Sequence, residues 1–313
     1  MIPGLSVLRT LFLWVGLIGI SFAWEIPFGD GLGKLSSSDK NQESFDIGLP
    51  YSMLSEAGQL HVLDPIQKKI MVFDVFGVLL HEISLDLEEL TPYHPIQAIQ
   101  LSLGSRYFLL SRKNQGMILL DPANNHIKIF HSQNLVNQEM LYPNDLKRYQ
   151  GFYFVSDLLA QKALIYSRLG NLLGKINYPE SLQIEAFSPN EVLCLTESKD
   201  RAQLELVSMS ADKRVFYRPP FHEGDEFVSL RIIGLDVLGN VYLERISGKK
   251  HGHAKHFVLK VNPLGQLQKE ARVEVTPADS FELGFRFVLM AEDKLFQLHF
   301  NKSALSVKGI LLK

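Results

Sequence analysis

The stretch Ile70–Leu80, which reads IMVFDVFGVLL, decides the fold class of this chain. It consists of two apolar runs joined by a short turn, and Gly77 supplies the positive φ that such a turn needs between two strands. The same pattern returns in Leu164–Leu173 (LIYSRLGNLL) and in Val258–Leu267 (VLKVNPLGQL). The turn glycines are 93 and 95 residues apart, which indicates that one β-hairpin unit is repeated along the chain.

The sequence around these hairpins, residues 49–313, has the texture of an all-β domain. Apolar runs of about five to eight residues alternate with Gly, Pro, Asn and Asp, and long patterns of helical period are missing. Proline, which suits the first residue of a strand, precedes six of these runs, at Pro50, Pro95, Pro143, Pro179, Pro220 and Pro277. Each module of about 40–50 residues has room for four strands, which is typical of a β-propeller blade.

The count of prolines favours a six-bladed propeller, although the length also allows seven blades. The last module has room for only three strands, in Phe285–Leu289, Leu295–Phe300 and Leu305–Leu312. A ring has no open edge only if another segment supplies the fourth strand, and the apolar segment Trp24–Phe28 is the candidate. We therefore predict that an N-terminal strand closes the last blade.

The register of the second module has two solutions. Leu120-Asp121-Pro122 resembles Leu63-Asp64-Pro65, and aligning the two would shift the strands of that module by one. A turn at Gly104 keeps the glycine intervals even and is preferred. In either register, Asp64, Asp121 and Asp157 are expected to hold turns by accepting hydrogen bonds from backbone amides.

Residues 1–23 are predicted to be a signal peptide. Arg9 precedes an apolar run from Leu11 to Ala23, and Ser21 and Ala23 form the small-x-small pattern that a signal peptidase reads. The alternative is an uncleaved membrane anchor. Residues 24–48 then form an N-terminal segment and linker, and 49–313 form the propeller. We expect a periplasmic or secreted protein with no membrane span after signal removal, or a membrane-anchored one if the signal stays attached.

Composition excludes several classes of protein. The 313 residues are 46% hydrophobic, too apolar for a disordered chain, and the net charge of −2 gives no basic field for nucleic acid. The single cysteine, Cys194, cannot form an internal disulfide. Because it lies in an apolar run, Val192–Leu195, we interpret it as a buried hydrophobic residue rather than a nucleophile.

The modules resemble NHL-type repeats of six-bladed propellers in the TolB-like superfamily. The first module carries the resemblance best, with Gly58, Val62, Asp64, Phe73, Asp74, Gly77 and Leu79 at the family's positions. The third module matches at Gly151, Val155, Asp157, Gly170 and Leu172. Lys69 stands where the family usually has arginine. The resemblance implies an exported propeller, a fold that serves enzymes, sensors and binding scaffolds alike.

The innermost strand of each blade should line the central channel, and those runs carry several polar residues. Asn144, Asp145, Glu185 and Glu282 could together hold a calcium ion through oxygen ligands. Such a site would resemble the metal site of lactonase-like six-bladed hydrolases. The competing interpretation is that polar side chains simply face a watery channel.

A second candidate site is the segment HGHAKH, in which His251, His253 and His256 could bind zinc or copper. The competing interpretation is an exposed hairpin tip, because Ser247-Gly248-Lys249-Lys250 precedes the segment and a strand follows it.

No nucleophile elbow, phosphate loop or zinc-protease helix is present in the sequence. The function we expect is therefore a non-catalytic scaffold that binds a protein, peptide or glycan at one face. A calcium-dependent, lactonase-like hydrolase is the alternative. A quinoprotein is disfavoured, since only Trp14 and Trp24 could serve as docking tryptophans.

Overall fold

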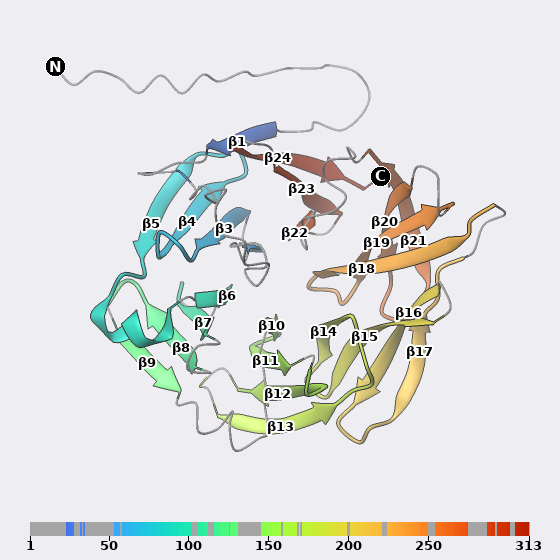
Figure 1. The fold of residues 1–313 in the computed structure, drawn as a ribbon, viewed down its shortest axis with the longest axis horizontal. Helices are drawn as coiled ribbons and strands as arrows, with labels where there is room; N and C mark the ends of the chain where they lie inside the picture. Colours follow the sequence, from blue (N-terminus) through green and yellow to red (C-terminus); the bar gives the residue numbers. More distant parts are fainter. Residues whose placement is uncertain are drawn as a thin grey trace.

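The structure is a computed structural model of the chain, and it forms a ring of six antiparallel four-stranded blades (Figure 1). It describes residues 23–27, 32, 34, 53–56, 58–94, 96–101, 105–111, 116–124, 126–130, 145–157, 159–167, 169, 171–198, 201–220, 224–249, 254–274, 287–291, 293–300 and 304–312. The all-β, six-bladed prediction is confirmed, and the seven-bladed alternative is wrong. Among the described residues no helix has the length and apolar character to cross a membrane.

Each of the first five blades is an up-and-down sheet whose first strand lies innermost. Blade 1 contains β2 (Met53–Glu56), β3 (Gln59–Asp64), β4 (Lys69–Asp74) and β5 (Leu79–Ser84). Blade 2 contains β6 (Ile96–Leu101), β7 (Tyr107–Ser111), β8 (Gly116–Asp121) and β9 (His126–Phe130). Blade 3 contains β10 (Asp145–Tyr149), β11 (Phe152–Asp157), β12 (Lys162–Tyr166) and β13 (Leu172–Asn177). A 3-10 helix, η1 (Glu88–Tyr93), lies between blades 1 and 2.

Blades 4 and 5 have the longest strands. Blade 4 contains β14 (Gln183–Ser188), β15 (Glu191–Ser198), β16 (Arg201–Ser208) and β17 (Lys213–Tyr217). Blade 5 contains β18 (Phe227–Leu235), β19 (Val241–Gly248), β20 (Lys255–Val261) and β21 (Leu267–Val273). A single parallel bridge, from Arg201 to Val228, connects the sheets of these two blades.

Blade 6 is built from both ends of the chain, as predicted. Its inner strands are β22 (Phe287–Ala291), β23 (Lys294–Phe300) and β24 (Ala304–Leu311), and its outer strand is β1 (Ala23–Pro27). β1 pairs antiparallel with β24 over its whole length, from Ala23 opposite Lys308 to Pro27 opposite Ala304. The indole ring of Trp24 then packs against Phe73 of blade 1, with ring centroids 5.3 Å apart. β1 therefore joins blade 6 to blade 1 and closes the ring.

The preferred register of the second module is confirmed by the strand order, in which β7 is the second strand and β8 the third, while Gly104 itself lies outside the described residues. Asp64 ends the second strand of blade 1, whereas Asp121 ends the third strand of blade 2, so the two are not equivalent. Asp64 and Asp157 do hold their turns as expected, because each accepts two backbone N–H groups within 3.1 Å. Asp121 also holds its turn, because its carboxylate accepts a backbone hydrogen bond from Asn124, and it accepts further hydrogen bonds from the side chains of Arg106 and Asn124.

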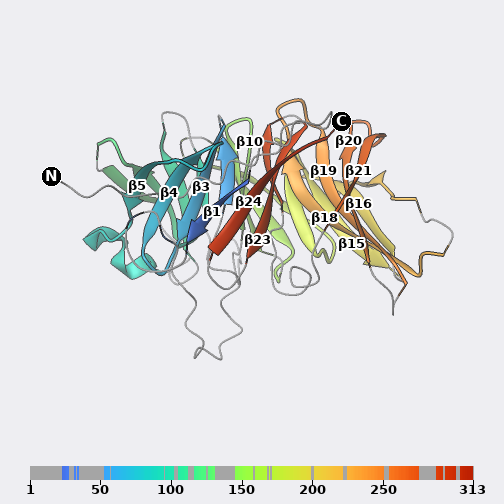
Figure 2. The ribbon, with the colours of Figure 1, turned by 90° about the horizontal axis from the view of Figure 1, so that it is seen from above.

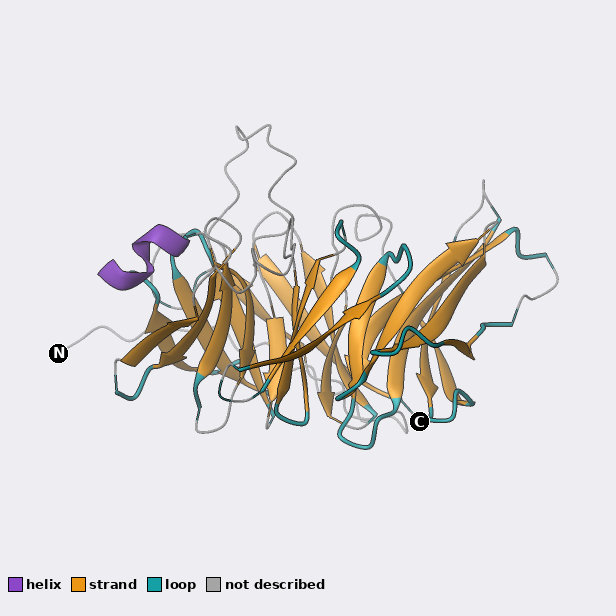
Figure 3. Cartoon of the chain, turned by 90° about the horizontal axis from the view of Figure 1, so that it is seen from below, coloured by secondary structure: helices purple, strands orange, loops and turns teal. Residues whose placement is uncertain are grey.

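The two faces of the ring differ in their connections (Figures 2 and 3). One face, which we name the turn face, carries the turns between first and second strands and between third and fourth strands of the blades. The other, which we name the loop face, carries the turns between second and third strands and the links between blades, including η1. In Figure 3 the loop face is uppermost and the short turns of the turn face run along the lower edge.

Candidate functional site

Two of the four predicted channel residues, Asp145 and Glu185, are brought together by the fold. Asp145 opens β10, the inner strand of blade 3, and Glu185 lies on β14, the inner strand of blade 4. The ammonium of Lys147 stands between them, with its Nζ 3.4 Å from Asp145 Oδ2 and 3.3 Å from Glu185 Oε2. Asn144 and Glu282 lie outside the described residues, so the full calcium site remains a prediction.

The charges of this triad, Asp145, Lys147 and Glu185, depend on one another. Burial alone would lower the pKa of Lys147, but the two carboxylates outweigh burial and raise it, so the ammonium stays protonated. Burial raises the pKa of Glu185, and Lys147 opposes that shift. A calcium ion at Asp145 and Glu185 would have to displace an ammonium that both carboxylates already hold.

The triad lies toward the loop-face end of the inner strands. Asp145 and Gln183 are the first residues of β10 and β14, which both begin at the loop face. Gln183 uses its whole amide, because its Nε2 donates to the carbonyl of Ile232 at 2.7 Å and its Oε1 accepts from the Ile232 N–H at 2.8 Å. Gln100 donates in the same way to the carbonyl of Leu146. These glutamines therefore link neighbouring inner strands.

His256 of the histidine-rich segment lies in a strand and not in a hairpin tip. It is the second residue of β20 and is buried, and its Nδ1 lies 2.9 Å from Glu244 Oε1 on β19. Arg231 of β18 reaches the other oxygen of the same carboxylate at 4.0 Å. His251 and His253 lie outside the described residues, so metal binding by the three histidines stays a prediction. Among the residues that are described, no three His, Cys, Asp or Glu gather in a way that could hold a metal ion.

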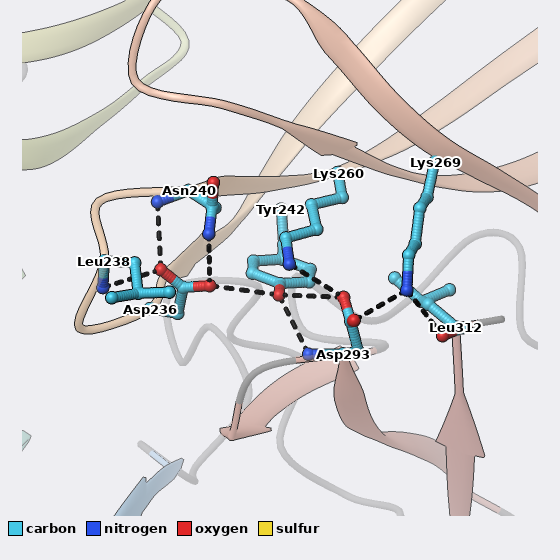
Figure 4. Close-up of polar contacts among 8 residues, drawn as sticks. All are labelled: Asp236, Leu238, Asn240, Tyr242, Lys260, Lys269, Asp293 and Leu312. Carbon is cyan, nitrogen blue, oxygen red and sulfur yellow. Dashed lines mark hydrogen bonds and ion pairs between the residues drawn. The ribbon is translucent and has the colours of Figure 1, made fainter.

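A larger polar cluster, which the sequence analysis missed, joins blades 5 and 6 (Figure 4). The carboxylate of Asp293 receives the ammonium groups of Lys260 at 3.0 Å and of Lys269 at 2.7 Å. The backbone N–H of Asp293 donates to the hydroxyl of Tyr242, which also lies 3.1 Å from Asp236 Oδ2. Lys269 donates in addition to the carbonyl of Leu312, which ties the chain end to blade 5.

The protonation states in this cluster suit a structural clamp. Burial raises the pKa of Tyr242 to about 12, and the Asp236 and Asp293 carboxylates add to that shift. Burial would raise the pKa of Asp293, but Lys269 and Lys260 together lower it, so the carboxylate is ionised. A phenol that stays protonated cannot act as a general base near neutral pH. The cluster therefore binds two blades together, and only the three-dimensional arrangement reveals it, since Tyr242 and Asp293 come from different modules.

Cys194 is fully buried on β15 between blades 3 and 4, as its apolar surroundings predicted. Burial raises the pKa of its thiol to about 12. An activated cysteine nucleophile needs the opposite shift, toward the thiolate. Cys194 is thus a core residue.

The fold defines the class of protein as a six-bladed β-propeller. No family model and no curated protein sequence matches this chain.

Several solved structures are similar in fold to this chain. A member of the duf4221 family from Bacteroides vulgatus has a TM-score of 0.57 and 10% identity, over 95% of this chain and 97% of that chain. A streptogramin B lyase has a TM-score of 0.53 and 10% identity, over 94% and 98%. A catalytically inactive virginiamycin B lyase from Staphylococcus aureus with quinupristin has a TM-score of 0.52 and 10% identity, over 93% and 100%. At this identity the similarity shows the fold alone.

Proposed function

We propose that this chain is an exported six-bladed propeller that works as a binding scaffold and recognises a basic peptide or protein segment with its loop face. The observation that carries the proposal is the charge of that face. Among the described residues, exposed acids gather in its connections, at Asp86, Glu88, Glu89, Glu180, Glu226 and Glu274. The same described connections of the loop face also expose three bases, Lys34, Arg218 and Lys249, so acids outnumber bases there, while the described connections of the turn face expose one acid, Asp212. A one-sided acidic rim attracts a basic partner and orients it during encounter.

The channel triad supports the same proposal. Asp145 and Glu185 bring two carboxylates and only one ammonium to the loop-face end of the inner strands. Their positions are fixed by Lys147, so a basic side chain entering from this face would meet oriented oxygens rather than mobile ones. The buried titratable groups described above are held by other protein groups or kept neutral, which suits recognition better than proton transfer.

The test is fluorescence anisotropy with a labelled lysine-rich peptide, a glutamate-rich peptide of the same length and a neutral oligosaccharide. We expect the lysine-rich peptide alone to bind, with an affinity that weakens as salt is added. The variant E88K/E89K/E180K should weaken binding about tenfold or more. The control variant Q150K/N171K/D212K adds four positive charges to the turn face, against six in the loop-face variant, and should bind within about threefold of the parent. Binding of no peptide, or equal loss in both variants, would overturn the proposal.

The alternative function, a calcium-dependent hydrolase, is favoured by one observation, the meeting of Asp145 and Glu185 across two blades. If calcium binds there, it must release Lys147, and the melting temperature should rise with added calcium but not with magnesium, which prefers a smaller octahedral site. An unchanged melting temperature up to millimolar calcium would dismiss this alternative.

A further inference from the structure

Four turns of the turn face share one geometry that places their second loop residue at the tip, whereas the turn that opens at Ser208 has the polar Ser210 at that position. A polar residue opens the turn, and its side-chain oxygen accepts two backbone N–H groups, from the residues two and four positions later. Asp74 accepts from Phe76 and Val78, both at 2.8 Å. The same bonds recur at Ser167, Asp236 and Asn262.

The residue at the tip is large, apolar and exposed in all four of these turns. The tips are Phe76 (60% exposed), Leu169 (65%), Leu238 (61%) and Leu264 (80%). Val237, next to one of them, is 91% exposed. The turn geometry requires only the polar first residue and, at Gly77, Gly239 and Gly265, a positive φ. A polar tip would fold equally well, so the fold itself does not explain the apolar side chains.

Exposed apolar residues occur on the turns of blades 3, 4 and 5, and contacts between these blades bring the turns close together. The methyl group of Met209, in a turn of blade 4, packs directly on Gly174 of blade 3. The turn at Gly265 of blade 5 packs on the backbone of Phe216 in blade 4. Gly239 in turn lies beside Pro263, so the tips at Leu238 and Leu264 are neighbours. Exposed apolar side chains that gather on the turns of adjacent blades mark interaction sites more often than single exposed residues do.

The exposed charged residues of the turn face are mainly basic. Exposed side chains at the turn-face ends of the described strands and turns are Arg106, Lys213, Arg214 and Lys294, against Asp212. The loop face, with its acids, has the opposite balance. Arg106 and Arg214 also pair with the carboxylates of Asp121 and Glu191. A surface that combines apolar tips with more exposed bases than exposed acids matches the boundary of an anionic bilayer.

The direction of β1 provides an independent observation. β24 runs toward the turn face, where Leu311 lies opposite Lys294, and β1 is antiparallel to it. The chain therefore enters β1, at Ala23, from the turn face. The sequence that precedes Ala23 is the apolar run beginning at Leu11. Whenever that run is in a membrane, its connection to β1 directs the turn face toward the same membrane.

We propose that the turn face docks on the surface of an anionic lipid bilayer and inserts its apolar tips into the interface. Moving each tip from water into the interface is favourable, and each nearby Lys or Arg adds electrostatic attraction to anionic headgroups. The loop face then points away from the membrane. This inference is independent of the partner that the loop face binds.

The first test uses a single fluorescent label on the full chain. Cys194 is buried, so a new surface cysteine can be labelled selectively with an environment-sensitive fluorophore. The turn-face variants are L169C and L264C, and the loop-face controls are I66C and L159C, whose native residues are also exposed. On mixing with vesicles containing about 30% anionic lipid, we expect blue-shifted emission about twofold brighter at 169 and 264 and no change at 66 and 159. Neutral vesicles should give a smaller response.

A second measurement separates the turn face from the N-terminal apolar run, which is the same in every variant. F76S/L169S/L238S/L264S should bind about tenfold less to anionic vesicles by flotation, while I66S/L159S/L182S should bind as the parent does. Circular dichroism checks that both fold. Equal binding of both sets, with no response of the turn-face labels, would show that the apolar run alone tethers the protein and would overturn the proposal. A response at the loop-face labels would also overturn it. So would the finding that the turn face binds another protein while its labels do not respond to vesicles.

Discussion

Single polar residues connect the blades of this ring to one another. His61 and Tyr107 share a hydrogen bond of 2.8 Å between blades 1 and 2, and Lys147 bridges blades 3 and 4. Gln100 links the inner strands of blades 2 and 3, Gln183 links those of blades 4 and 5, and Asp293 forms ion pairs between blades 5 and 6. Because each of these contacts joins two neighbouring blades, its loss should weaken the packing between those blades rather than the fold of one blade.

His61 should make the stability of the protein depend on pH. Burial lowers its pKa to about 4, and His81 contributes, so the ring is neutral in the folded protein. An unfolded histidine titrates near 6.5, so the unfolded state binds more protons between about pH 4 and 6.5. The free energy of unfolding therefore has its full value above about pH 6.5, and it decreases by up to about 3 kcal/mol as the pH falls through this window.

The measurement is urea unfolding of the parent and of H61Q at pH 7.5 and pH 4.5. H61Q is expected to lose less stability between the two values than the parent does. H126Q serves as the control, because His126 is exposed, and it should keep the parent's dependence. An identical pH dependence in H61Q and the parent would contradict this role.

Lys147 should be required for the stability of the folded protein, because its ammonium lies between two carboxylates. K147M leaves Asp145 and Glu185 facing each other without a cation, and we expect a loss of about 3–5 kcal/mol in the free energy of unfolding near neutral pH. K175M removes an exposed lysine and should change stability by less than about 0.5 kcal/mol. Adding D145N and E185Q to K147M should restore much of the loss. No loss in K147M would show that the triad contributes little.

The sequence predicted some of these residues and not others, for a physical reason. Asp64 and Asp157 act on amides two and three residues away, so local spacing was enough to assign them. Asp145 and Glu185 were placed together because both were assigned to inner strands. The Tyr242–Asp293 contact joins residues 51 apart in different blades, and no local pattern encodes it.

Among the elements, β1 decides whether the ring is closed. Its prediction from sequence needed only a count, because the last module lacked a fourth strand and an apolar segment was available. The structure adds what the count could not show, namely that Trp24 fills the seam with blade 1. The indole lies so close to Gly77 that no side chain fits there. Gly77 therefore serves both its turn and the closing contact.

Removing the closing strand should destabilise the whole protein. Deletion of residues 23–27 should lower the melting temperature sharply, and W24A alone should cost about 2–4 kcal/mol, since Trp24 is partly buried. L32A, at a residue 78% exposed, is the control and should leave the melting temperature unchanged. A deletion variant that melts like the parent would mean that the ring does not need β1.

The reactivity of the Cys194 thiol can be used to measure how often the whole ring opens. It lies between blades 3 and 4, away from the closing seam. In the native protein a thiol reagent at pH 8 should react with it only after opening, because burial both shields it and raises its pKa to about 12. The deletion of residues 23–27 should speed the reaction about tenfold or more, since an open ring loses cooperativity. Immediate, stoichiometric reaction of the folded parent would contradict this expectation.

The two faces give the ring a polarity that the sequence analysis did not predict. Turn spacing located the hairpins, but a linear pattern does not show which turns share a face. Once the blades are stacked, the four apolar tips described above fall on the turn face, whereas the loop face carries most exposed acids of the described connections together with the exposed apolar residues Ile66, Leu159 and Leu182. The proposed functions of membrane docking and partner binding follow from that division.

The most direct test of this account is a disulfide across the closing strand. Glu25 and Ser306 are opposite each other in the β1–β24 register, and Ser306 donates a hydrogen bond to Glu25 at 2.8 Å. The account predicts that E25C/S306C forms an intramolecular disulfide on mild oxidation and melts at a higher temperature than its reduced form. E25C/K308C, in which the second cysteine is two residues out of register, should cross-link poorly. Failure of E25C/S306C to cross-link within one molecule, or equal cross-linking of both pairs, would contradict a ring closed by its N-terminal strand.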